Sequence, residues 1–262
     1  MRLKPSLSQK KLVIERKNRY FSISRYGRIE VTDTVENGAE VRLLLVNGTR
    51  ESATFLAPGL RNLPVFEYIR TIGNILREND FVRDTLLIGG AGFSLPKFYI
   101  TYFPGRRMDV VENNPEMVDI ARRFFFLEEL DVTLEADEQA SLRTIIDDGL
   151  HFLATQEAQY DMIINDAFVG RVADNKLAGE DGVQKVYDRL RPGGVYLVNA
   201  ITARTGQGSM PGVMAIERMS RVFGNAKMIP VREDYPAHES QNVILYAKKA
   251  SAESADALRV TA

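Results

Sequence analysis

The chain has 262 residues and a net charge of −1, so it is long enough for one or two domains with a sizeable core. Hydrophobic residues make up 45% and charged residues 26%, which is typical of a globular protein and excludes a largely disordered chain. Cysteine is absent, which excludes disulfides and thiolate chemistry, and only two histidines disfavour a metal site. Because we find neither a basic excess nor a signal-like or membrane-spanning apolar run, we expect a cytoplasmic protein without nucleic-acid or membrane partners.

The first quarter of the chain has the pattern of short antiparallel strands. Asn37-Gly38 and Asn47-Gly48 lie between apolar runs, and Asn-Gly is the strongest short signal for a hairpin turn. The predicted strands are residues 11–17, 27–35, 41–46 and 50–56. We therefore predict a small N-terminal β-hairpin domain over residues 1–63, packed on the rest of the chain or on a partner chain.

From residue 64 onward, strands alternate with helices. The predicted strands are residues 85–88, 107–111, 143–146, 161–165, 195–199 and 243–247. The predicted helices are residues 65–77, 94–102, 115–127, 150–156, 177–190 and 210–223. This alternation predicts an α/β domain over residues 64–250, with a mostly parallel sheet, helices on both faces and a flexible tail over 251–262. Residues 128–138 carry six acids, and we interpret them as a solvated loop.

Ligands of open parallel sheets bind beyond the carboxyl ends of the strands, so the residues there are the candidates for function. Gly89, Gly90 and Gly92 follow the first strand of the domain. Glycines let a backbone approach a ligand, although a tight strand–helix turn also uses them. A dinucleotide motif would need a third glycine where the chain has Leu95, which disfavours an NAD-binding protein.

Acidic residues follow the next strands. Glu112 comes after the second strand and before Asn113, where a carboxylate can accept hydrogen bonds from a ribose diol or cap the following helix. Asp148 precedes Gly149, where it could accept from an adenine amine or serve as an ordinary helix cap. Asp166 directly follows a buried strand, so it could act as a base, hold a cationic substrate or begin a capped loop.

These segments occur in the chain as LLIGGAG, VVENNPEMVDIARRFF, DDGLHFL, YDMIINDAF and LRPGGVYLVN. Together they resemble the spermidine synthase (polyamine aminopropyltransferase) group of the class I SAM-dependent methyltransferase superfold. The resemblance implies a Rossmann-like methyltransferase sheet with a small N-terminal antiparallel β domain. It also implies a homodimer, because aminopropyltransferases often use such a β unit in oligomers.

The resemblance implies roles for the residues at the strand ends. The glycine loop would contact the amino-acid or aminopropyl side of an adenosyl sulfonium, which is decarboxylated S-adenosylmethionine or S-adenosylmethionine itself. Glu112, followed by Asn113, would hold the ribose hydroxyls, and Asp148 would reach the adenine amine with clearance from Gly149. Asp166 takes the place of the catalytic aspartate, and no metal is implied.

The chain also departs from the family pattern. Val169 stands where the family has a second acid, and the glycine loop lacks the acid that binds the amine of the aminopropyl group. The acidic segment that precedes the sheet in the family retains Glu67, and Tyr235 is a further candidate on the substrate side.

Three hypotheses remain open. The first is aminopropyl transfer to an amine with Asp166 as the base, because the whole chain resembles that group. The second is a SAM-dependent methyltransferase of unknown acceptor, because the acids that bind polyamine are lost. The third is a non-catalytic protein of the same fold that binds a nucleoside.

Overall fold

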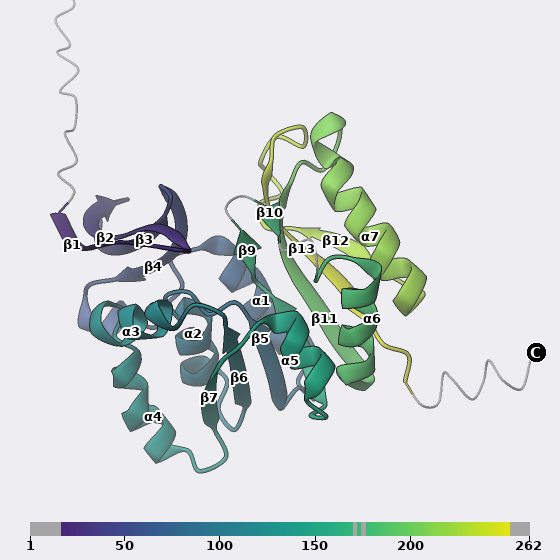
Figure 1. The fold of residues 1–262 in the computed structure, drawn as a ribbon, viewed down its shortest axis with the longest axis horizontal. Coiled ribbons are helices and arrows are strands. Elements are labelled where there is room, and N and C mark those ends of the chain that lie inside the picture. The colour runs from purple at the N-terminus through teal and green to yellow at the C-terminus, as the bar shows by residue number, and fades with distance from the viewer. Residues whose placement is uncertain (1–16, 170–171, 174–176, 252–262) are drawn as a thin grey trace, which may run out of the picture.

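The N-terminal part of the chain forms a four-stranded antiparallel sheet. The computed structural model describes residues 17–169, 172–173 and 177–251 (Figure 1). The strands pair in chain order: β1 (Lys17–Ser24), β2 (Gly27–Glu36), β3 (Ala39–Val46) and β4 (Thr49–Phe55). Asn37 and Asn47 have φ angles of 50° and 51°, as the predicted Asn-Gly turns require. Apart from Lys17, the strand predicted over residues 11–17 lies outside the described residues, and the sequence interpretation missed β1.

A seven-stranded sheet forms the second part of the chain, with the order β12-β13-β11-β8-β5-β6-β7. Its strands are β5 (Asp84–Ile88), β6 (Arg107–Glu112), β7 (Ser141–Ile146), β8 (Tyr160–Asn165), β11 (Leu190–Thr202), β12 (Lys227–Pro230) and β13 (Gln241–Lys248). β5, β6, β7, β8 and β11 are parallel, and β12 and β13 add an antiparallel edge. The predicted fold class is confirmed, although the short strand β12 was not predicted. A ribbon of β9 (Phe168–Val169) and β10 (Val172–Ala173) follows β8.

Helices cover both faces of this sheet because its strands alternate apolar side chains toward the two faces. Leu87 and Ile164 belong to one core, and Leu86 and Ile163 belong to the other. The first face is covered by α1 (Glu67–Glu78), α2 (Ser94–Tyr102), α3 (Pro115–Phe124) and α4 (Leu130–Ala136). The second face is covered by α5 (Gly149–Thr155), α6 (Glu180–Arg189) and α7 (Met210–Phe223). Across the described ranges, no helix is long and apolar enough to cross a membrane.

The prediction of a solvated loop over residues 128–138 is wrong. The chain there continues from a 3-10 turn, Leu127–Glu129, into α4. Leu127, Leu130 and Leu134 recur at helical spacing among the acids and pack on the core, with Leu130 only 1% exposed. The acidic side chains therefore form the solvated face of a helix, because burial of the leucine stripe outweighs the local charge.

The N-terminal sheet packs against α3, at the opposite end of the molecule from α7 (Figure 1). Ile29 and Val31 of this sheet are fully buried against Met117 and Phe125. The predicted division into residues 1–63 and 64–250 stays a prediction, and of the predicted tail only Ser251 lies within the described residues. The packing carries β4 to the carboxyl ends of the parallel strands, where ligands of such sheets bind.

Candidate functional site

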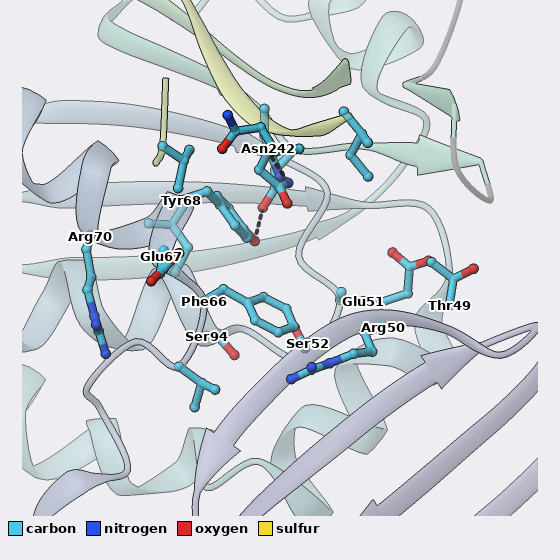
Figure 2. Close-up of a pocket in the computed structure, with 18 of the residues that line it drawn as sticks. Thr49, Arg50, Glu51, Ser52, Phe66, Glu67, Tyr68, Arg70, Ser94 and Asn242 are labelled. Atoms are coloured by element: carbon cyan, nitrogen blue, oxygen red, sulfur yellow. Dashed lines mark hydrogen bonds between the residues drawn. The ribbon is translucent and has the colours of Figure 1, made fainter. Parts of the chain in front are cut away.

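Two adjoining cavities lie where the N-terminal sheet meets the carboxyl ends of β5, β6 and β8. The larger has a volume of about 840 Å³ (Figure 2), and the smaller has a volume of about 300 Å³. Glu51, Gly89, Ala91 and Asp166 line both cavities, so these residues form the junction between them. Both volumes are in the range of small-molecule sites.

Glu112 holds the glycine loop of the smaller cavity. Its carboxylate is buried at the end of β6, where Oε2 accepts from the backbone N–H groups of Gly90 (2.8 Å) and Ala91 (3.0 Å). Its Oε1 accepts from the N–H of Asn114 at 2.9 Å. The carboxylate therefore links the ends of β5 and β6, which is a wider structural role than the helix cap considered from the sequence. Asn113 lies beside it and also lines the smaller cavity.

Asp148 and Asn114 bring further polar atoms to the smaller cavity. Asp148 caps α5, because its Oδ1 accepts from the N–H groups of Leu150 and His151, both at 3.0 Å. Its Oδ2 has no hydrogen-bond partner among the described residues and lies on an exposed side chain. The buried Nδ2 of Asn114 also lacks a partner in the described part of the chain. One free acceptor and one unsatisfied donor suit a polar, nucleoside-like ligand. Gly149, beside Asp148, is buried and lines the same cavity.

The glycine loop is held in a strained, closely packed conformation. Gly89 has a φ of +95°, and a Cβ atom there would lie 2.7 Å from the carbonyl oxygen of Asp166. Ala91 and Phe93 also lie in the left-handed region, with φ angles of 43° and 58°. A left-handed backbone conformation costs free energy in residues other than glycine. Such residues cluster at ligand sites, where the surrounding packing enforces the conformation.

Three consecutive residues of β4 attach the N-terminal sheet to the glycine loop and α2. Ser52 Oγ accepts from the N–H of Gly92 at 3.0 Å, and a Cβ atom on Gly92 would lie 2.7 Å from Ser52 Cβ. The carbonyl of Ala53 accepts from Ser94 Oγ at 2.8 Å. The next residue, Thr54, accepts through Oγ1 from the Nζ of Lys97 at 3.1 Å. These contacts fix the position of the preceding residue of β4, Glu51.

Asp166 lies at the junction of the cavities and is held by two side chains. Tyr68 donates its hydroxyl to Oδ2, and Asn199 donates Nδ2 to Oδ1, both at 2.8 Å. The dashed line at the hydroxyl of Tyr68 in Figure 2 marks the first of these bonds. Asn242 in turn donates to Oδ1 of Asn199 at 2.9 Å. Burial raises the pKa of the Asp166 carboxyl to about 6, against the opposing effect of the two hydrogen bonds. A carboxyl group with a pKa near neutrality is suited to general-base chemistry.

Glu51 is the second carboxyl group at the junction. Burial, followed by the negative charges of Asp166 and Glu112, raises the pKa of Glu51 to about 7. In the described residues no group forms a hydrogen bond or ion pair with its carboxylate. Figure 2 shows Glu51 at the opposite side of the larger cavity from Arg70.

The outer part of the larger cavity contains acids paired with arginines. Glu67 Oε2 lies 3.6 Å from Nε of Arg232, whose guanidinium also lies over the ring of Tyr235. Glu36 pairs with Arg50 at 2.8 Å. The structure thus brings both substrate-side candidates, Glu67 and Tyr235, to the same cavity as Asp166.

The sequence interpretation missed four side chains at the site: Glu51, Tyr68, Asn199 and Asn242. Asn199 ends a predicted strand, so the rule that selected Asp166 would also have selected it. The other three depend on contacts between distant segments, for which the sequence carries no local signal. Among the described residues, no three His, Asp or Glu side chains are grouped as ligands for a metal ion.

An open, mostly parallel sheet with an antiparallel edge and a nucleoside-sized cavity at its strand ends defines a Rossmann-like protein of the methyltransferase type. Residues 66–220 match the Spermine/spermidine synthase domain family, and the chain belongs to this family. The predicted family resemblance is therefore confirmed.

Similar proteins agree with this assignment. A curated "probable polyamine aminopropyl transferase" of Bifidobacterium longum is 26% identical over 65% of this chain and 34% of its own length. The matches span between 27% and 49% of the length of the first three curated relatives. A probable spermidine synthase from Corynebacterium glutamicum has a similar solved structure, with a TM-score of 0.70 at 19% identity over 89% of this chain and 80% of that chain. Human methyltransferase-like protein 13 in complex with SAH shares the fold, with a TM-score of 0.55 at 22% identity over 75% and 92% of the two chains.

The raised pKa of Glu51 leads to a prediction about stability. Between about pH 4.5 and 7 the folded chain binds more protons at this site than the unfolded chain, so the stability contributed by Glu51 falls as the pH rises. We expect Glu51→Gln to raise the melting temperature by about 2–4 °C at pH 8 and to have little effect at pH 5. Thermal unfolding at both pH values measures this, with the exposed Glu40→Gln as the matched control. An equal shift at both pH values would contradict the electrostatic cause.

Proposed function

We propose that this protein binds an adenosyl sulfonium and transfers its aminopropyl group to an amine, with Asp166 as the base. The observation that carries the proposal is the position of Asp166 at the junction of the two cavities, where Tyr68 and Asn199 orient both carboxylate oxygens. Membership of the spermine/spermidine synthase family and the names of the curated relatives support this reaction.

The smaller cavity would hold the adenosyl group. Glu112 would accept from a ribose hydroxyl through the lone pair that is left on Oε1 while it holds the glycine loop, and Asn113 would border the ribose. Asp148 would accept from the adenine amine through its free Oδ2, above Gly149. The backbone of Gly89 and Gly90 would lie along the chain that carries the transferred group. Gly92 lines neither cavity, and its N–H donates to Ser52, so its part is to hold the loop against β4. S-adenosylmethionine and its decarboxylated form both carry the adenosyl group that these residues would bind.

The larger cavity would hold the acceptor amine. A free amine of this type has a pKa of about 10, so it arrives protonated and must lose a proton before it attacks. Asp166 would take that proton, and the nitrogen lone pair would then form a bond to the carbon attached to sulfur. The carbon–sulfur bond breaks with its electron pair on sulfur, which leaves neutral methylthioadenosine. Glu67 and Tyr235 would contact the outer end of the acceptor.

Methyl transfer is the second candidate because the glycine loop carries no acid for an aminopropyl amine. Calorimetric titration with methylthioadenosine and S-adenosylhomocysteine distinguishes the candidates, since only the second ligand carries the amino-acid group. Tighter binding of methylthioadenosine, together with transfer of aminopropyl to an amine, supports the proposal. Tighter binding of S-adenosylhomocysteine would favour methyl transfer, and binding of neither would favour a non-catalytic protein.

We also propose that the chain forms a homodimer through its N-terminal sheet. One face of β1 contacts α3, where Tyr20 donates to Glu116 at 2.9 Å. The other face exposes Phe21 and Ile23, which are 56% and 75% accessible. The predicted cytoplasmic location stays a prediction.

The proposed dimer predicts the effect of a charge on this face. We expect Ile23→Glu to convert the dimer to a monomer, because it places a charge in an apolar contact. Light scattering after gel filtration measures the mass. Val132→Glu is the matched control, because Val132 is 72% exposed on α4. A wild-type monomer, or a dimer that survives Ile23→Glu, would contradict the prediction.

A further inference from the structure

Glu51 has a fixed position on β4, but no positively charged group of the described residues pairs with its carboxylate. The hydrogen bonds from Gly92, Ser94 and Lys97 to the next three residues of β4 hold this part of the strand against the glycine loop. Because the strand is held in this position, the side chain of Glu51 borders both cavities. Within the described ranges, no cation pairs with it, whereas Glu36 and Glu67 of the same cavity each have an arginine partner.

The charges around Glu51 favour a cationic ligand at the junction. Asp166 and Glu112 lie close enough to oppose its ionisation, and burial opposes it further. A buried carboxylate that is charged without a partner is destabilising, and a cation placed beside Glu51 would relieve this cost. The proposed donor carries two positive charges, a sulfonium and a primary ammonium, separated by three carbons.

We propose that Glu51 binds the primary ammonium of the aminopropyl donor and so selects the decarboxylated form over S-adenosylmethionine. This assignment rests on the proposed function. In this assignment the acid that binds the ammonium comes from β4, because the glycine loop of this chain has no acidic residue. A carboxylate on the carbon next to that ammonium would be brought toward Glu51 and Asp166, and repulsion between like charges excludes it. Asp166 then remains available to the acceptor amine.

Calorimetry with three ligands tests the assignment: decarboxylated S-adenosylmethionine, S-adenosylmethionine and methylthioadenosine. We expect the wild type to prefer the decarboxylated donor. Glu51→Gln should weaken the binding of that donor by about 10- to 100-fold, because a charge-assisted contact is lost. The affinity for methylthioadenosine, which has no ammonium, should stay unchanged. Glu51→Asp, which keeps the charge, should restore part of the loss, and Glu40→Gln should change neither affinity.

The outcomes separate this inference from the proposed function. If Glu51→Gln weakens the decarboxylated donor and methylthioadenosine equally, or if the wild type binds S-adenosylmethionine as tightly as the decarboxylated donor, the role of Glu51 is overturned while adenosyl binding stands. If the wild type binds none of the three ligands, the proposed function itself is overturned. Thermal unfolding of each variant identifies any loss that arises from misfolding.

Discussion

Asp166→Asn should lower the turnover of aminopropyl transfer by about 10²–10⁴-fold, the usual contribution of a general base. The amide cannot accept the proton that the acceptor amine must lose. The substitution keeps the shape of the side chain, because Oδ1 can still accept from Asn199 and the Tyr68 hydroxyl can turn to accept from the new amide. Release of methylthioadenosine measures the turnover, and calorimetry with the same molecule should show that its affinity is unchanged.

Tyr68→Phe distinguishes a base from a structural aspartate. The Tyr68 hydroxyl donates to Asp166, and this hydrogen bond lowers a pKa that burial has raised to about 6. Without the hydrogen bond the pKa of Asp166 rises, so the acidic limb of the rate–pH profile should move to higher pH. If Asp166→Asn retains near wild-type turnover, or if Tyr68→Phe leaves the limb in place, Asp166 is not the base.

The residues that the sequence identified at the site are those whose position is set locally. Glu112 ends β6 and Asp166 directly follows β8, and parallel strands bring their carboxyl ends to one edge of the sheet. The glycine loop could be identified for the same reason. The predicted strands and their order along the chain were therefore sufficient to place Glu112, Asp166 and the glycine loop at one edge of the sheet.

The remainder of the site depends on how the two sheets pack together. Glu51 belongs to the N-terminal sheet, and it reaches the junction only because β4 binds the glycine loop and α2. Tyr68 reaches Asp166 across 98 residues of sequence. No local pattern encodes such contacts. The helix α4 was missed for another reason, since its core-facing Leu130 and Leu134 are interleaved with acids whose number suggested a loop.

Glu112→Gln should abolish tight binding of methylthioadenosine and also destabilise the fold. The buried carboxylate accepts from three backbone N–H groups, those of Gly90, Ala91 and Asn114. An amide offers only one oxygen, so its NH₂ group must face at least one of these donors, which costs about 1–3 kcal/mol of unfolding free energy. The same change loosens the glycine loop and removes an acceptor for the ribose, so we expect the affinity to fall by about 10²-fold.

Asp109→Asn on the same strand is the control that separates binding from stability. Asp109 accepts from Arg143 and from Tyr160, and it lines neither cavity, so its amide variant should lose stability without losing affinity. Urea unfolding and calorimetry with methylthioadenosine on both variants measure the two effects. If Glu112→Gln binds methylthioadenosine as the wild type does and loses only stability, Glu112 holds the loop and has no contact with the ribose. A loss of affinity in Glu112→Gln alone shows that the nucleoside depends on this carboxylate and the loop it holds, because Asp109→Asn makes the same carboxylate-to-amide change on the same strand outside both cavities.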